Sequence, residues 1–458
     1  MNQAMNELPS LDVLAHQMAQ GLRSSRDLVE ECLAKITEPD GQGSRAFTYV
    51  NAQAARACAD AVDLQRVNGS FSSRFAGIPI SIKDLFDVAG QITSAGSRVL
   101  ADTAPAQKDA LAVSRLRQAG FILIGRTQMP EFALSSLGLN DYQGTPLSAW
   151  GRIPGGSSSG AAISVANGFA HAALGSDTGG SCRIPAAFCG IVGFKPTANC
   201  IPMDGMIPLS PSLDAIGPLA RTVACCASLH GILSGGSDTV LRGRPLKGMR
   251  FGIPQTLALD LLDLPVSHAF ARALEALSSA GAHIIEKPYS AFANVPSMNA
   301  RGGFVAAESL AWHRPWIAQK RDLYDPRVLS RIERGNLMTA IDYIDLIQDR
   351  RQFKKSVEEE SIGLDAILMP TCAIVPPRID ELGEDEAFAR ATILALRNAS
   401  LVNLFDGCAI SLPMQVHGEL PSGLMIAAPS GCDHEILAIA TAIEAVLKHQ
   451  RKQLFVHP

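Results

Sequence analysis

Short apolar runs alternate with amphipathic helical patterns along this chain, and this alternation restricts the fold more than any other feature. The run at 76–83 (AGIPISIK) is typical of a buried strand, the pattern at 109–119 predicts a helix, and a second strand-like run follows at 121–125. A later helix pattern over 266–280 is also followed by a strand-like run. Strands that alternate with helices indicate an α/β layer fold. Some connections are too short for a parallel crossover, so we expect a mixed sheet.

The first 70 residues are predicted to be mostly helical. Ser10 is placed to cap a first helix, and Ser24 or Ser25 is placed to cap a second. A third amphipathic stretch covers 52–67. Neither a repeat nor a low-complexity linker divides the chain, so we expect one domain over 1–458.

The composition excludes several classes of function. The 458 residues are 47% hydrophobic and carry a net charge of −4, without the basic excess that nucleic acids or acidic membranes attract. The longest apolar stretches fall short of a membrane span of about 20 residues, and the N-terminus does not resemble a signal peptide. The ten scattered cysteines fit neither a zinc site nor a disulfide framework. We therefore expect a cytoplasmic protein with buried free thiols and no metal.

Two glycine-rich turns each carry a serine. One spans 155–160 (GGSSSG) and contains Ser157, and the other spans 175–181 (GSDTGGS) and ends at Ser181. Glycine lets the backbone come close to a reacting group and direct N–H groups at it. A serine hydroxyl becomes an effective nucleophile only when a base takes its proton.

Lys83, at the end of the first predicted strand, is a candidate for that base. A lysine can accept a proton near neutral pH if burial lowers its pKa from about 10.4 towards roughly 7–8. Together with Ser157 and Ser181 it could carry out acyl transfer without a histidine.

Other interpretations of the serine turns remain open at this stage. The segment 156–160 also fits GxSxG, the nucleophile elbow of α/β-hydrolases, in which Ser158 would attack with the help of Asp433 and His434, or of His417. A phosphate-binding loop is disfavoured because neither GxxxxGK[ST] nor GxGxxG occurs. No cofactor is therefore expected. The turns could also be tight structural loops without a catalytic role.

Four segments carry a resemblance to a known family. They are 77–84 (GIPISIKD), 154–160 (PGGSSSG), 174–196 (LGSDTGGSCRIPAAFCGIVGFKP) and 212–219 (SLDAIGPL), with weaker echoes at 365–371 and 420–424. In these motifs the chain resembles the amidase signature family, over nearly its whole length. The resemblance implies a single α/β domain whose mixed sheet is flanked on both faces by many helices, with the catalytic core at 75–220.

The resemblance also implies roles for individual residues. Ser181 matches the nucleophile, Ser157 the bridging serine that follows a cis peptide bond, and Lys83 the general base. The backbone N–H groups that match the family's oxyanion hole are those of Thr178, Gly179, Gly180 and Ser181. Supporting positions are matched by Ser158, Arg183 and Asp177, although Asp177 also suits a purely structural turn. By the same analogy, Met129 and Phe132 could line the acyl side of the pocket, or could belong to the core.

The activity implied is hydrolysis of a small carboxylic amide to an acid and an amine or ammonia, through an acyl-enzyme on Ser181 and a proton relay of Lys83 and Ser157. Two alternatives use the same residues. One is the glutaminase component (the A-type protein) of a tRNA-dependent amidotransferase, and the other is a hydrolase of ureido acids of the allophanate or carboxybiuret type. The expected partner is a small-molecule amide, without nucleic acid or membrane, and a homodimer is possible.

Overall fold

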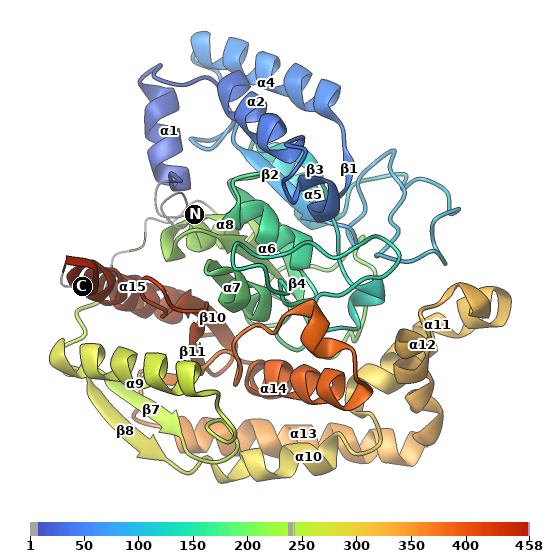
Figure 1. Ribbon diagram of the computed structural model, residues 1–458, viewed down its shortest axis with the longest axis vertical. Helices are drawn as coiled ribbons and strands as arrows, with labels where there is room; N and C mark the ends of the chain where they lie inside the picture. Colours follow the sequence, from blue (N-terminus) through green and yellow to red (C-terminus); the bar gives the residue numbers. More distant parts are fainter. Residues whose placement is uncertain (1–7, 237–240, 242, 457–458) are drawn as a thin grey trace.

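Eleven strands form one sheet through the middle of the computed structural model, which describes residues 8–236, 241 and 243–456 (Figure 1). The strands are β1 (Phe47–Val50), β2 (Pro79–Lys83), β3 (Ile122–Thr127), β4 (Ala172–Asp177), β5 (Val192–Lys195), β6 (Ala215–Ala220), β7 (Arg250–Pro254), β8 (His283–Lys287), β9 (Ala366–Pro370), β10 (Cys408–Pro413) and β11 (Gly423–Ala428).

The sheet is mixed, as the sequence predicts. Its order is β1-β3-β2-β4-β6-β5-β10-β11-β9-β7-β8. Strand β2 pairs in parallel with β3 and β4, strand β7 pairs in parallel with β8 and β9, and the remaining pairs are antiparallel. The connection between β10 and β11 spans only 414–422, which is too short for a parallel crossover.

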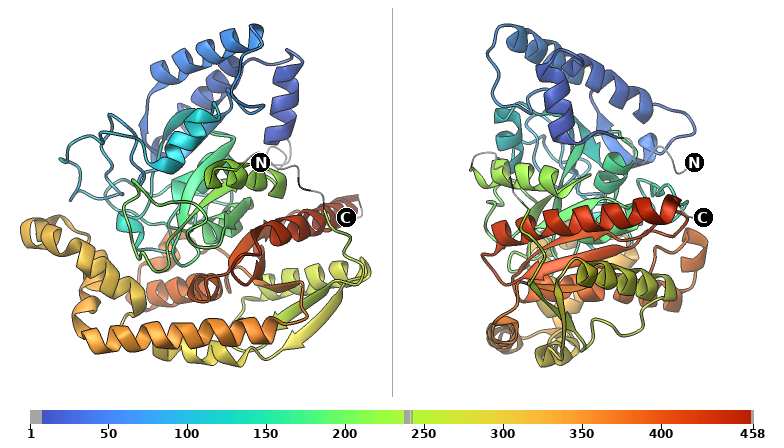
Figure 2. Two further views of the ribbon diagram at one scale, coloured as in Figure 1. Left: turned by 180° about the vertical axis from the view of Figure 1, so that it is seen from behind. Right: turned by 90° about the vertical axis from the view of Figure 1, so that its left-hand side faces the viewer.

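Helices cover both faces of this sheet (Figure 2). Successive strand residues point to opposite faces, so in β10 Ile410 packs in one apolar cluster and Ala409 in another. Helices α8, α9 and α15 supply buried side chains to the first cluster, whereas α13 and α14 supply the second. The fold predicted from the resemblance is therefore confirmed. The longer helices are α1 (Leu11–Ala19), α2 (Ser25–Ile36), α4 (Ala52–Val67), α5 (Leu111–Gln118), α6 (Ser159–Ala166), α7 (Arg183–Cys189), α8 (Val223–Ser234), α9 (Leu264–Ser279), α11 (Gly303–Lys320), α12 (Pro326–Glu333), α13 (Ala340–Ser361), α14 (Asp385–Leu404) and α15 (Asp433–Val456).

The N-terminal part, followed from residue 8 because residues 1–7 lie outside the described chain, is mostly helical as predicted. Ser10 accepts a hydrogen bond from the Val13 N–H, and Ser24 caps α2 with a reciprocal contact to Asp27. The exception is β1, which pairs antiparallel with β3. Its sequence, FTYV, consists of β-branched and aromatic residues that suit a strand once a neighbouring edge is available.

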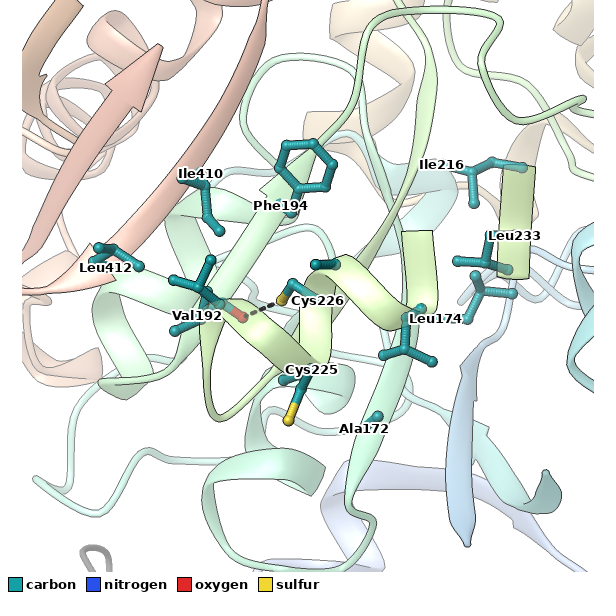
Figure 3. Close-up of a cluster of buried hydrophobic side chains, with 14 of the residues drawn as sticks. Ala172, Leu174, Val192, Phe194, Ile216, Cys225, Cys226, Leu233, Ile410 and Leu412 are labelled. Carbon is teal, nitrogen blue, oxygen red and sulfur yellow. Dashed lines mark hydrogen bonds between the residues drawn. The ribbon is translucent and has the colours of Figure 1, made fainter. Parts of the chain in front are cut away.

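The first apolar cluster also contains the two adjacent cysteines of the sequence. Helix α8 lies over strands β4, β5 and β6, with Cys225 and Cys226 among the buried side chains (Figure 3). The Cys226 Sγ lies 3.8 Å from the Val192 carbonyl oxygen. All ten cysteines fall within the described chain and all are free thiols, with Cys58 the exposed one. Across residues 8–236, 241 and 243–456, no helix is long and apolar enough to cross a membrane.

The parallel part of the sheet determines where polar side chains can gather. Because β2, β3 and β4 run in the same direction, their carboxyl ends meet at one edge. Those ends are Lys83, Thr127 and Asp177. The carboxyl edge of such strands is where α/β proteins place their ligands.

Candidate active site

Lys83 lies at the carboxyl edge of the parallel strands and is fully buried. Its exposed fraction is 0%, and its Nζ atom lies 2.7 Å from Ser157 Oγ and 2.8 Å from Ser176 Oγ. Removal from water disfavours the charged ammonium, and it lowers the pKa of Lys83 to about 7, against the opposing influence of nearby acidic groups such as Asp177. A neutral lysine is therefore accessible near neutral pH.

The two serine turns meet beside this lysine. The Ser158 N–H donates to the Ser181 carbonyl oxygen at 3.2 Å, which joins the first turn to the second. The peptide bond between Gly156 and Ser157 is cis. A Cβ atom on Gly156 would lie 2.5 Å from the Ser135 carbonyl oxygen, so only glycine fits there. Ser157 is fully buried and Ser181 is 8% exposed. Ser181 is thus the more exposed of the two, and within the described chain its hydroxyl has no hydrogen-bond partner.

The four predicted oxyanion donors are not equivalent. The Gly180 N–H donates to Asp177 Oδ1 at 2.8 Å, so this amide already has an acceptor. We therefore correct the predicted set: within the described residues, the N–H groups without an acceptor are those of Thr178, Gly179 and Ser181. Gly180 has a φ of 125°, and a Cβ atom there would lie 2.5 Å from Ala399 Cβ. Its role in the loop is to let the backbone turn tightly against α14.

Asp177 and Arg183 form a fully buried ion pair that holds this loop. Arg183 Nη2 donates to Asp177 Oδ1 at 2.8 Å and Arg183 Nε to Asp177 Oδ2 at 3.0 Å. Asn403 on α14 closes the network, because its amide group donates to Asp177 and accepts from Arg183. Burial alone would raise the pKa of Asp177, but Arg183 and the hydrogen bonds hold it well below its ordinary value. These contacts favour a structural role for Asp177, which holds the turn in place.

Ser158 occupies a supporting position. It is fully buried, and its hydroxyl donates to the Ser176 carbonyl oxygen at 3.2 Å. A nucleophile elbow requires a strand directly before the serine. The last strand before Ser158 is β3, and between them lies only a short 3-10 turn at Glu131–Ala133. The geometry of an α/β-hydrolase elbow is therefore missing here.

Met129 and Phe132 belong to the apolar core. They are 0% and 3% exposed, and Phe132 packs edge-on against His313 of α11 with ring centroids 4.3 Å apart. The backbone of Phe132 is left-handed, with a φ of 49°. The expectation that these two line a pocket is not supported.

Their neighbours Pro130, Glu131 and Leu134 instead line a cavity of about 170 Å³. The opposite wall of this cavity comes from α12, including Arg331, and from Phe388 of α14. The Arg331 Nη1 donates to the Leu134 carbonyl oxygen at 2.6 Å. The next residue, Ser135, also lines the cavity, and it is the residue that approaches Gly156. One loop therefore separates this cavity from the serine turn.

Three further residues of the site are not predicted by the sequence patterns. Ser176 lies inside the glycine-rich turn that ends at Ser181, and only the strand register brings it to Lys83. Asn403 and Arg331 come from helices more than a hundred residues away along the chain. Within the described residues, no group of three or more His, Cys, Asp or Glu side chains could hold a metal ion.

Comparisons with known proteins show what the whole chain is similar to. A family model described as Amidase matches residues 27–437. The chain is 33% identical over 404 residues to a 2-amino-5-chloromuconic acid deaminase of Comamonas testosteroni, with 86% of each chain covered. It is 32% identical over 465 residues to the A-type component of the glutamyl-tRNA(Gln) amidotransferase of Chromohalobacter salexigens, covering 93% of this chain and 94% of that one. A crystal structure of an amidase superposes with a TM-score of 0.87 at 31% identity, covering 95% of this chain and 99% of the other.

Proposed function

This chain belongs to the amidase family, whose members hydrolyse carbon–nitrogen amide bonds, and we propose that it acts through an acyl-enzyme on Ser181. The observation that carries the proposal is the contact of 2.7 Å between Lys83 Nζ and Ser157 Oγ beside the turn of Ser181. It joins a buried lysine, whose pKa is lowered to about 7, to a serine of the other turn.

In the first half-reaction, neutral Lys83 takes a proton from Ser157 while Ser157 takes one from Ser181. The Ser181 Oγ then attacks the amide carbonyl carbon. The backbone N–H groups of Thr178, Gly179 and Ser181 stabilise the negative charge that develops on the carbonyl oxygen. Donors of this kind contribute about 3–4 kcal/mol each in related sites.

Collapse of the tetrahedral intermediate breaks the C–N bond. Ser157 gives its proton to the departing nitrogen and is reprotonated by Lys83, so the amine or ammonia leaves neutral. Water then attacks the acyl-enzyme along the same relay, and the carboxylic acid is released with Ser181 regenerated. The sum is one amide and one water converted to one acid and one amine.

The cavity next to the serine turn supports a finer proposal, that the amide carries a carboxylate. Arg331 is half-buried and, within the described chain, forms no ion pair. Beyond its bond to Leu134, its guanidinium has donors left for a planar anion. Three acids also line this cavity, namely Glu131, Asp141 and Asp325. The two oxygens of Glu131 accept from the Ser97 hydroxyl and the Asp325 N–H, and Asp325 Oδ1 accepts from the N–H groups of Arg327 and Val328. The similarity to the 2-amino-5-chloromuconic acid deaminase of Comamonas testosteroni supports the same substrate class.

Arg331→Gln tests this assignment against Arg334→Gln, which changes an exposed arginine on the same segment. The probes are the p-nitroanilides of succinic acid and of butyric acid, which differ in one carboxylate. We expect Arg331→Gln to lower kcat/KM for the succinyl probe about 10- to 100-fold, as for a lost charged hydrogen bond, and to leave the butyryl probe unchanged. Equal losses on both probes would show that Arg331 only supports the fold.

A second candidate function is ammonia release within an amidotransferase complex. It is favoured by the 32% identity to the A-type component of a glutamyl-tRNA(Gln) amidotransferase. The purified chain should therefore be assayed alone on glutamine, aryl amides and ureido acids, with Ser181→Ala as the blank. Turnover of aryl amides without glutaminase activity supports the free-standing amidase. Glutaminase activity alone supports the amidotransferase component, and turnover of ureido acids alone supports the third alternative.

A further inference from the structure

The carboxylate of Asp214 is buried beside the loop that carries the proposed oxyanion donors. Asp214 directly precedes β6 and is 1% exposed. The pairing of Asp177 with Ala215 between β4 and β6 brings it opposite Thr178. The Thr178 hydroxyl donates to Asp214 Oδ1 at 2.5 Å, a charge-assisted hydrogen bond.

The second oxygen of this carboxylate is also occupied. Asp214 Oδ2 accepts from the backbone N–H groups of Leu209 and Ser210, at 3.0 and 3.1 Å. Within the described residues, every hydrogen bond to Asp214 therefore comes from an uncharged donor. Burial raises the pKa of Asp214 to about 6, and the nearby Glu308 adds to this effect. An asparagine at this position would avoid the cost of burying a charged carboxylate, but its NH₂ group would then face the N–H donors of the backbone. This position therefore favours a side chain that only accepts hydrogen bonds, such as a carboxylate.

The segment that directly precedes Asp214 is tied to helices α11 and α13. The Ser210 and Ser212 hydroxyls donate to Glu308 of α11, at 2.6 and 2.5 Å. The Tyr343 hydroxyl of α13 donates to the same carboxylate at 2.6 Å. Asp214 is thus fixed from behind and can hold Thr178 in place.

Thr178 is well suited to transmit this constraint. Threonine is branched at Cβ, so its χ1 angle has few allowed values, and fixing the hydroxyl also fixes the backbone that carries the N–H. We propose that Asp214 is a positioning residue for the amidase reaction, which orients the Thr178–Ser181 loop so that its free N–H groups face the attacked carbonyl oxygen. This inference rests on the function proposed above. It gives a role to an aspartate that touches neither Lys83 nor the two serines through any hydrogen bond of the described chain.

Variants of Thr178 test the inference without removing the buried charge. Thr178→Val deletes the hydroxyl at nearly constant volume, and Thr178→Ser keeps it. Asp214→Asn changes the other partner, and Thr441→Val is the control, because the Thr441 hydroxyl donates within α15 to Leu437. For each variant, kcat and KM are measured on the p-nitroanilide that the wild type turns over best. The rate of labelling of Ser181 by a fluorophosphonate is measured in parallel, since that adduct places an oxygen where the oxyanion would lie.

We expect Thr178→Val and Asp214→Asn to lower kcat and the labelling rate about 10- to 100-fold with KM nearly unchanged, as for a small misplacement of reacting groups. Thr178→Ser keeps the hydroxyl but loses the branch at Cβ, so its kcat and labelling rate should fall between those of Thr178→Val and the wild type. Thr441→Val should stay within about twofold of the wild type, and the double variant of Thr178 and Asp214 should lose no more than the worse single variant. If Asp214→Asn does not fold, the comparison of Thr178→Val with Thr178→Ser still tests the inference. Unchanged kcat in Thr178→Val, or an equal loss in Thr178→Ser, would overturn the positioning role. Failure of the wild type itself to label at Ser181 would instead overturn the proposed function.

Discussion

Lys83 and Ser157 lie 74 positions apart in the sequence, and their Nζ and Oγ atoms are 2.7 Å apart in the structure. The contact is buried on all sides, because both residues are 0% exposed. A proton can therefore pass between them without exchange with bulk water, and the state of the lysine determines whether it can accept one.

This contact predicts the pH dependence of the reaction. Burial lowers the pKa of Lys83 to about 7, and only the neutral amine can accept a proton. Activity should therefore be low below this pKa and rise as the pH increases through it, reaching a plateau above about pH 8. The measurement is kcat/KM of the wild type from pH 5 to 9. Lys83→Met should lose nearly all amidase activity together with this limb, and a variant that kept both would show that another group is the base.

Ser181→Ala should abolish turnover and leave the fold intact. Ser181 is the most exposed serine of the two turns, and loss of an acting nucleophile can lower the rate about a million-fold. Mass spectrometry after fluorophosphonate labelling should place the adduct on Ser181. An adduct on Ser158 would contradict this assignment and support the nucleophile elbow.

Ser157→Ala should slow the hydrolysis of an amide more than that of an ester with the same acyl group. An amine leaves only after protonation, whereas a phenoxide leaves with little help, and Ser157 is the proposed proton donor. The measurement is kcat/KM for a matched aryl amide and aryl ester, in Ser157→Ala, Lys83→Met and the double variant. The double variant should lose little more than either single one, because the two residues act as one relay. Equal losses on amide and ester would reduce Ser157 to a structural part of the turn.

Arg183→Met should destabilise the protein. It leaves the Asp177 carboxylate buried without its cation, and breaking such a pair costs about 3–5 kcal/mol of unfolding free energy. Arg327→Met is the matched control, because Arg327 and Asp385 form an exposed pair that should contribute about 0–1 kcal/mol. Urea unfolding of both variants measures the difference. Similar midpoints for the two would argue that the Asp177 network does not depend on this cation.

Single replacement of His171, His417 or His434 by glutamine should leave most of the activity, since the proposed base is a lysine. Burial lowers the pKa of His171 to about 3, so this imidazole stays neutral over the working range. Dialysis against EDTA should likewise leave the rate unchanged. A loss of activity on chelation that zinc restores would overturn the relay of Lys83 and Ser157.

The parts of the site that the sequence predicts are those encoded by local patterns. The turn of Ser157 and the strand of Lys83 each show their character within a few residues, and the family motifs relate one to the other. The hydrogen bond from the Gly180 N–H to Asp177 is not predicted by such patterns, because it depends on side-chain geometry within a turn. Asn403 and Arg331 enter the site through the packing of α14 and α12, which no local pattern encodes. The same reason explains β1, whose strand conformation depends on the edge that β3 offers.

The distance along the chain between Asp177 and Asn403 has a consequence for biosynthesis. The two are 226 positions apart, and β5, the strand that follows the Ser181 turn, pairs with β10 from the same late part of the chain. A nascent chain that has emerged to residue 300 holds Lys83, both serines and Arg183, yet it lacks the amide that bridges Asp177 to Arg183 and the strand that completes the sheet. Such long-range contacts form late and slow the search for the native state. We therefore expect a fragment that ends before α14 to carry every proposed catalytic group and yet to remain inactive.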